Sequence, residues 1–176
     1  MRSIALPSVF RRVVGFVAVG LALTATAGCT VPEDAVAGIS VTDDGHLLGV
    51  MMVCGHQIDG ATVYVESDDA DDERTVGSWT AHRPLKAGLT TWPLDAPAAD
   101  WTTTTSLTRL NAKTTYALYG WTKDNSWSSS SVSFTLTDRS QLTPGTVLYD
   151  DISANGDEST GIVPLAEFKA TACKDD

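Results

Sequence analysis

The stretch LNAKTTYALYGWTKDNSWSSSSVSFTL, residues 110–136, decides the fold that this sequence predicts. Apolar and polar residues alternate on both sides of a connection rich in Asp, Asn and Ser, which is typical of two antiparallel strands. A period of two puts Tyr116 and Leu118 on one face of the first strand. On the second strand it groups Val132, Phe134 and Leu136. The stretch therefore predicts a β-hairpin.

The spacing between Leu110 and Tyr116 resembles a known motif. The two residues lie six positions apart across a polar corner, which is similar to the tyrosine corner of fibronectin type III and related immunoglobulin-like domains. In those domains a Tyr near the start of the penultimate strand returns its hydroxyl to the backbone a few residues upstream. The resemblance implies an all-β, immunoglobulin/fibronectin type III-like antiparallel β-sandwich.

Residues before the hairpin predict the other strands of such a sandwich. Segments 37–41 and 47–54 flank a Gly-containing connection, and residues 61–66 alternate cleanly. Their order and spacing also resemble a fibronectin type III module, but the Trp usual near the end of the second strand is absent. Trp79 is expected to fill the core instead. Further strands are expected at 75–82, 89–92 and 101–110 and, after the hairpin, at 146–149.

The C-terminal part changes its period. Leu165, Phe168 and Ala172 recur at helical spacing, and Pro164 suits the first turn of a helix. Residues 150–161, by contrast, are polar and rich in turn formers. We expect one short helix that packs a C-terminal extension onto the sandwich.

The N-terminus has the features of a secretory signal. Basic residues precede an apolar run at 13–23 that is too short to span a bilayer comfortably, and small residues follow it up to Cys29. The ending Ala-Gly-Cys resembles a bacterial lipobox, with Thr26 departing from the large aliphatic residue usual at that position. The resemblance implies that residues 1–28 are removed and that Cys29 carries acyl chains such as palmitate. The alternative is cleavage nearby by an ordinary signal peptidase, which leaves Cys29 free.

An acylated Cys29 would hold the domain at the extracytoplasmic face of the cell membrane, because each buried methylene contributes about 0.8 kcal/mol. We expect residues 29–37 to form a tether and residues 38–176 to form the sandwich with its C-terminal extension. The whole pattern also resembles uncharacterised small lipoproteins of actinobacteria, a resemblance that implies location and fold but no activity.

Charge limits the classes of partner. The formal net charge of the whole chain is −10, and removal of residues 1–28, which hold three basic and no acidic residues, makes it −13. Such a domain is not expected to bind nucleic acid or anionic head groups by charge. Six of the eight residues at 66–73 are carboxylates. This run predicts a solvated loop rather than a calcium site, because it lacks EF-hand spacing.

Three cysteines are present, and acylation of Cys29 would leave Cys54 and Cys173. In an oxidising compartment these two thiols favour a disulfide that encloses nearly the whole domain. A zinc site is the alternative and would recruit His56 and His46 beside Cys54, but their spacing fits no tetrahedral site.

Motifs for catalysis are missing from the sequence. There is no G-x-S-x-G elbow and no phosphate-binding Gly loop. His46, His56 and His82 stand at expected turns or strand ends, where no spacing singles out a triad. The sequence therefore predicts neither an enzyme nor a cofactor.

Aromatic residues give the best indication of a ligand site. If Tyr116 and Leu118 face the core, Tyr119 and Trp121 face outward, and Trp127 follows in the adjoining loop. Such side chains could stack on a sugar or anchor a protein partner. The alternative is that another sheet or the C-terminal helix covers this face.

These features predict a lipid-anchored binding or assembly module of the cell envelope with a carbohydrate or protein ligand. A structural envelope lipoprotein without a ligand is the second interpretation, and an enzyme of unrecognised class is the third.

Overall fold

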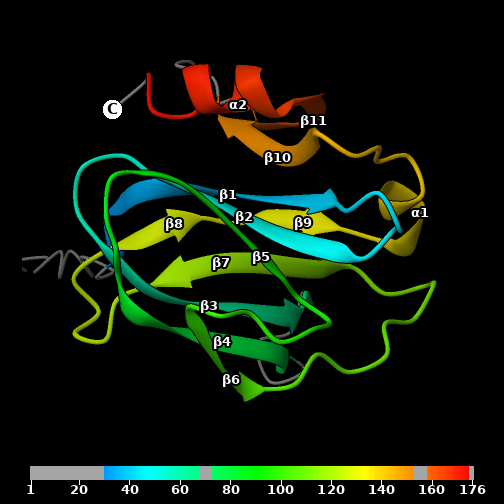
Figure 1. The fold of residues 1–176 in the computed structure, drawn as a ribbon, viewed down its shortest axis with the longest axis horizontal. Coiled ribbons are helices and arrows are strands. Elements are labelled where there is room, and N and C mark those ends of the chain that lie inside the picture. The colour runs from blue at the N-terminus through cyan, green and yellow to red at the C-terminus, as the bar shows by residue number, and fades with distance from the viewer. Residues whose placement is uncertain (1–29, 68–72, 153–157, 175–176) are drawn as a thin grey trace, which may run out of the picture.

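The computed structural model describes residues 30–67, 73–152 and 158–174, so the predicted signal peptide, Cys29 and the centre of the acidic run at 66–73 lie outside the described residues. Within them the chain forms eleven strands and two short helices (Figure 1). In chain order these are β1 (Glu33–Val41), β2 (Leu47–Val53), β3 (Ile58–Val65), β4 (Arg74–Leu85), β5 (Gly88–Pro93), β6 (Trp101–Thr105), β7 (Tyr116–Trp121), β8 (Ser128–Ser130), β9 (Val132–Phe134), α1 (Leu136–Arg139), β10 (Thr146–Ile152), β11 (Glu158–Pro164) and α2 (Leu165–Thr171).

The strands join into one curled sheet whose two halves share a core. One half runs β5-β2-β1-β10-β11 and the other runs β6-β4-β3-β7, with β8 and β9 both paired to β7. Strand β1 links the halves, because it pairs antiparallel with β2 and parallel with β8. The predicted all-β fold is confirmed, but the parallel β1–β8 pair makes the sheet mixed rather than purely antiparallel.

Large apolar side chains fill the space between the two halves. Trp79 is only 1% exposed, which confirms its expected place in the core. Trp92 and Trp101 stack on each other with ring centroids 4.4 Å apart. Burying a large apolar side chain contributes about 1.5–3 kcal/mol, so these rings are among the large contributors to the stability of the core.

The predicted hairpin is present. Tyr116 pairs with Phe134 and Leu118 with Val132 across β7 and β9. The hydroxyl of Tyr116 accepts a hydrogen bond from the backbone N–H of Asn111 at 2.8 Å, which is the contact expected of a tyrosine corner. Leu136 is an exception, because it begins α1 instead of continuing the strand.

The predicted tether at 29–37 is wrong from residue 33 onward. β1 begins at Glu33, and Ala35 pairs with Val53 of β2. Ala35 and Ala37 are 3% and 0% exposed, so this segment alternates into the core. Alanine has a low strand propensity, so the sequence pattern did not indicate that the strand begins as early as residue 33.

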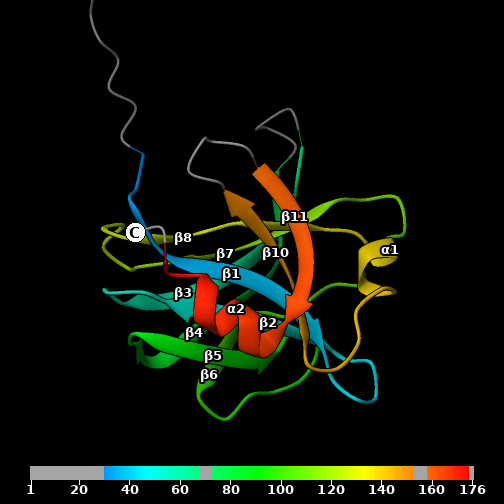
Figure 2. The same ribbon diagram turned by 90° about the horizontal axis from the view of Figure 1, so that it is seen from above.

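The predicted C-terminal helix is confirmed as α2, and it covers the outer face of β2 and β10 (Figure 2). Phe168 is fully buried there between Val50 and Val147. The sequence missed β11, which pairs with β10 along the segment expected to be a polar turn region. No helix among the described residues is long and apolar enough to cross a bilayer.

The predicted disulfide is confirmed. Cys54 and Cys173 are bonded, with Cα atoms 5.4 Å apart, and the bond ties the end of α2 to the end of β2. Because Cys54 is consumed by this bond, it cannot serve as the zinc ligand of the alternative interpretation.

Candidate ligand-binding groove

The outer face of β3 and β7 carries two of the three aromatic residues that the sequence singled out, Tyr119 and Trp121. Thr62 lies opposite Tyr119, and Gly60 lies opposite Trp121. Because side chains alternate along a strand, the core residues between them point the other way. Tyr119 and Trp121 are both partly exposed. The helix that could have covered this face lies instead on the other half of the sheet.

The indole of Trp121 lies across the neighbouring strand. A Cβ atom at Gly60 would stand 2.3–2.7 Å from three atoms of the benzo ring, so only glycine leaves room for the ring. The indole N–H donates to the Thr62 hydroxyl at 2.9 Å. The hydroxyl is also 3.3 Å from the Ser78 hydroxyl. The indole ring of Trp121 is therefore fixed in one position, packed flat over Gly60.

Tyr64 completes the aromatic surface. Its ring meets that of Tyr119 edge to face, with centroids 5.7 Å apart and planes at 78°. Burial, together with the charges of Glu66 and Glu73, raises the pKa of Tyr64 above its ordinary value, so its hydroxyl remains a donor at neutral pH. Sequence reasoning missed Tyr64 as a site residue, although the alternation at 61–66 already placed it opposite the core residues.

These rings line a groove of about 520 Å³. Its walls come from β3, β4, β7, β8, the start of β1 and the residues just before β1. Most of the lining side chains carry a hydroxyl or an amide, and a few are charged. The lining residues outside the aromatic surface include Thr30, Glu33, Arg74, Thr75, Asn125 and Ser128. A flat aromatic ring surrounded by short hydrogen-bonding groups suits a ligand that has both an apolar face and several hydroxyls.

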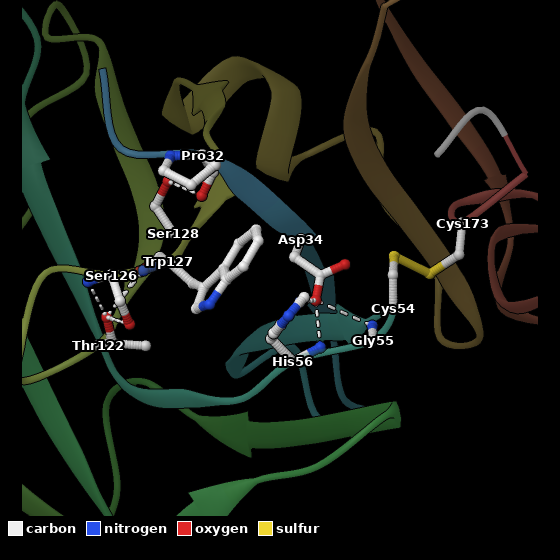
Figure 3. A network of polar contacts seen from close by, with 10 residues as sticks. All are labelled: Pro32, Asp34, Cys54, Gly55, His56, Thr122, Ser126, Trp127, Ser128 and Cys173. Atoms are coloured by element: carbon white, nitrogen blue, oxygen red, sulfur yellow. Dashed lines mark hydrogen bonds and ion pairs between the residues drawn. A yellow bond between two sulfur atoms is a disulfide. The ribbon is translucent and has the colours of Figure 1, made fainter. Parts of the chain in front are cut away.

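Trp127 does not line this groove. Its ring stacks on His56, with centroids 3.6 Å apart and planes at 17° (Figure 3). His56 Nδ1 lies 2.6 Å from a carboxylate oxygen of Asp34. The same oxygen accepts from the backbone N–H of Gly55 at 3.1 Å. The structure therefore separates the three predicted residues. Tyr119 and Trp121 line the same groove, whereas Trp127 packs against His56 in the turn that follows β2.

A larger hollow of about 950 Å³ lies beside the ends of β4 and β5. Its rim carries exposed Arg83 and Lys86, and Trp101 borders it. Trp101 is only 6% exposed, so it offers little ring surface to a ligand. The smaller groove is the better candidate because its rings are fixed, accessible and flanked by hydrogen-bonding groups.

The histidines serve separate local contacts. His46 lies 2.9 Å from Asp95, His82 lies 3.2 Å from the Thr102 hydroxyl, and His56 belongs to the Trp127 stack. In the part of the chain that the structure describes, no group of three or more His, Cys, Asp or Glu could hold a metal ion.

We expect His46 to make stability depend on pH. The hydrogen bond to Asp95 and its charge, with a smaller contribution from Asp44, raise the pKa of His46 above 6.5. Burial and Arg139 oppose this shift. Because the folded state holds the proton more tightly, the stabilisation is complete below the unfolded-state pKa and is lost as pH rises through the folded-state pKa.

Urea unfolding of wild type and His46→Gln at two pH values tests this expectation. The variant should be less stable than wild type at about pH 5.5 and equally stable at about pH 9, where the His46 ring of wild type is neutral in both the folded and the unfolded state. Equal losses at the two pH values would contradict a role for the protonated ring.

Comparisons with protein-family models, curated proteins and solved structures find no significant match to this chain.

Proposed function

We propose that this chain is a lipid-anchored, extracytoplasmic binding module of the cell envelope, and that its groove binds a neutral carbohydrate. The observation that carries the proposal is the indole ring of Trp121, which is held over Gly60 by its hydrogen bond to Thr62 and lines the groove. A sugar presents an apolar C–H face for such a ring and hydroxyls for the polar groups around it.

Charge and groove chemistry favour a neutral sugar over an anionic one. The domain after residue 28 has a formal charge of −13, so a ligand carrying phosphates or carboxylates meets an unfavourable field. Hydroxyl and amide groups can donate and accept hydrogen bonds, which matches the hydroxyls of a sugar. A protein partner remains the second ligand class, since exposed Tyr and Trp side chains also anchor protein interfaces.

An immunoglobulin/fibronectin type III-like type of sandwich is part of the proposal. Strands β1, β2 and β5 lie in one half, and β4, β3 and β7 lie side by side in the other. This grouping and the Tyr116 corner support the type. Strand β6, inserted before the corner, and the pair β10–β11 depart from the plain module.

Trp121→Ala should weaken carbohydrate binding at least about tenfold, the factor that corresponds to a loss of 1.4 kcal/mol. The measurement is a screen of neutral oligosaccharides, including glucans, mannans and galactans, followed by calorimetry on any that bind. Loss of the indole hydrogen bond should also cost about 1 kcal/mol of stability, which leaves the domain folded.

Two further variants separate binding from folding. Gly60→Ala keeps the indole but forces it off the sheet, so it should weaken binding as well. Tyr149→Ala removes a partly exposed aromatic ring beside α2, on the other half of the sheet, and should leave binding unchanged. Full affinity in Trp121→Ala would place the site elsewhere, and no binding by wild type would favour a structural component without ligand.

The proposed anchor has its own test. Intact-mass analysis of protein extracted from membranes should show a mature chain that begins at an acylated Cys29, as the lipobox-like ending predicts. Cys29→Ser should release the protein from the membrane fraction. An unmodified Cys29, or a mature chain with another first residue, would remove the anchor from the proposal.

A further inference from the structure

One wall of the groove is the segment that directly follows Cys29. Thr30, Val31 and Glu33 line the hollow together with Tyr119 and Trp121. The groove is therefore built partly from the residues nearest to the proposed lipid attachment site, and its position relative to a membrane depends on how freely that segment can move.

The segment is fixed almost from its start. The backbone N–H of Ser128 donates to the Pro32 carbonyl at 3.0 Å, and Glu33 pairs with Ser128 in the parallel ladder. The next residue, Asp34, accepts from the backbone N–H of Cys54 at 2.9 Å through its carbonyl. Its carboxylate also accepts from Gly55 (Figure 3). From Pro32 onward the chain is part of the sandwich.

This attachment leaves a short reach between anchor and domain. Only Thr30 and Val31 separate Cys29 from Pro32, and a fully extended chain spans at most about 3.5 Å per residue, so the reach is about 10 Å. A free tether through residue 37 would have reached about 30 Å by the same measure. An acylated Cys29 would therefore hold the groove at the surface of the bilayer rather than away from it.

We infer that the groove takes the neutral sugar headgroup of a lipid in the same membrane. This inference rests on the proposed function, that is, on acylation of Cys29 and on sugar binding by the indole ring of Trp121. A headgroup sugar stands at the height that a reach of about 10 Å allows. An anionic headgroup is disfavoured, because the acidic domain would add its repulsion to that of an anionic membrane surface. Free sugar shares the same chemistry, so the experiment must distinguish the two sources.

The test uses the full lipidated protein in phosphatidylcholine vesicles that contain a glucosyl or mannosyl diacylglycerol with a photoactivatable group on the sugar. Wild type should be labelled, and mass spectrometry should locate the label on residues that line the groove. Trp121→Ala should be labelled several-fold less. Vesicles with a photoactivatable phosphatidylglycerol, which carries a charged headgroup, should give little labelling of the groove.

A spacer variant isolates the effect of the short reach. Ten Gly and Ser residues inserted between Cys29 and Thr30 leave every groove residue in place and add a mean span of about 18 Å. Labelling by the membrane glycolipid should fall at least about threefold, because the effective concentration of headgroups at the groove falls. Binding of the free methyl glycoside, measured by calorimetry, should be equal in wild type and spacer variant.

The outcomes separate the two levels of the proposal. If wild type binds free oligosaccharide but is not labelled in the membrane, or if the spacer leaves labelling unchanged, the headgroup inference is overturned and sugar binding stands. If wild type binds neither source, the proposed function fails.

Discussion

Replacing Cys54 and Cys173 by Ser should lower the free energy of unfolding by about 4–5 kcal/mol, because the bond closes a very long loop in the unfolded chain. The bonded residues are 119 positions apart. Since small domains are stable by only about 5–15 kcal/mol, the variant should be close to unfolding at ambient temperature.

Guanidinium titrations of wild type, reduced wild type and the double-Ser variant measure this effect. Reduction should shift the wild-type midpoint to that of the variant, and reductant should not move the variant further. A midpoint that is the same with and without the bond would show that the unfolded chain is restrained in another way. Local strain is not expected to offset the gain, because the Cα separation of 5.4 Å lies in the usual range.

Phe168→Ala should give the second large loss of stability, about 3–5 kcal/mol, as expected when a buried aromatic ring is truncated. Phe168 is 0% exposed and meets Tyr149 edge to face at 5.1 Å. It is the residue of α2 that enters the apolar cluster with Val50 and Val147. Without it, the contacts of the helix with the cluster are reduced to those of the partly buried Leu165 and Ala172, beside the disulfide.

The neighbouring residue provides a matched control. Lys169 lies in the same helix and is exposed, so Lys169→Ala should change the unfolding free energy by less than about 0.5 kcal/mol. Combined with the double-Ser variant, Phe168→Ala should cost less than it does alone, because the helix is then already loosened. A loss below about 1 kcal/mol from Phe168→Ala would mean that α2 contributes little to folding.

Features with local causes could be predicted from the sequence. The β7–β9 hairpin, the contact between Tyr116 and Asn111, and α2 each follow from a period or a spacing within a short stretch. The pairing of Cys54 with Cys173 could be predicted for another reason, since the proposed acylation of Cys29 would leave only these two thiols. Periodicity also placed Tyr119 and Trp121 on the outer face, because alternation in a strand is fixed by backbone geometry.

Features with distant causes could not be predicted. Trp127 turns toward His56, a residue from another part of the chain, so its own neighbourhood carries no signal of where it points. The parallel pairing of β1 with β8 likewise depends on two segments that meet only in the fold. Strand β11 is polar along much of its length because it lies at an edge of the sheet, and a polar edge strand resembles a loop in sequence.

The position of β1 between early and late strands determines the order in which this domain can fold. β1 pairs with β2 at once, but its other neighbours, β8 and β10, come from the last third of the chain. Pairing over such sequence distances slows folding, and unpaired apolar strands are prone to aggregate until their partners arrive. During synthesis the N-terminal strands appear first, so the sandwich cannot close until the late strands β8 and β10 have been made. Truncation of the chain before β10 should therefore abolish folding rather than remove one layer.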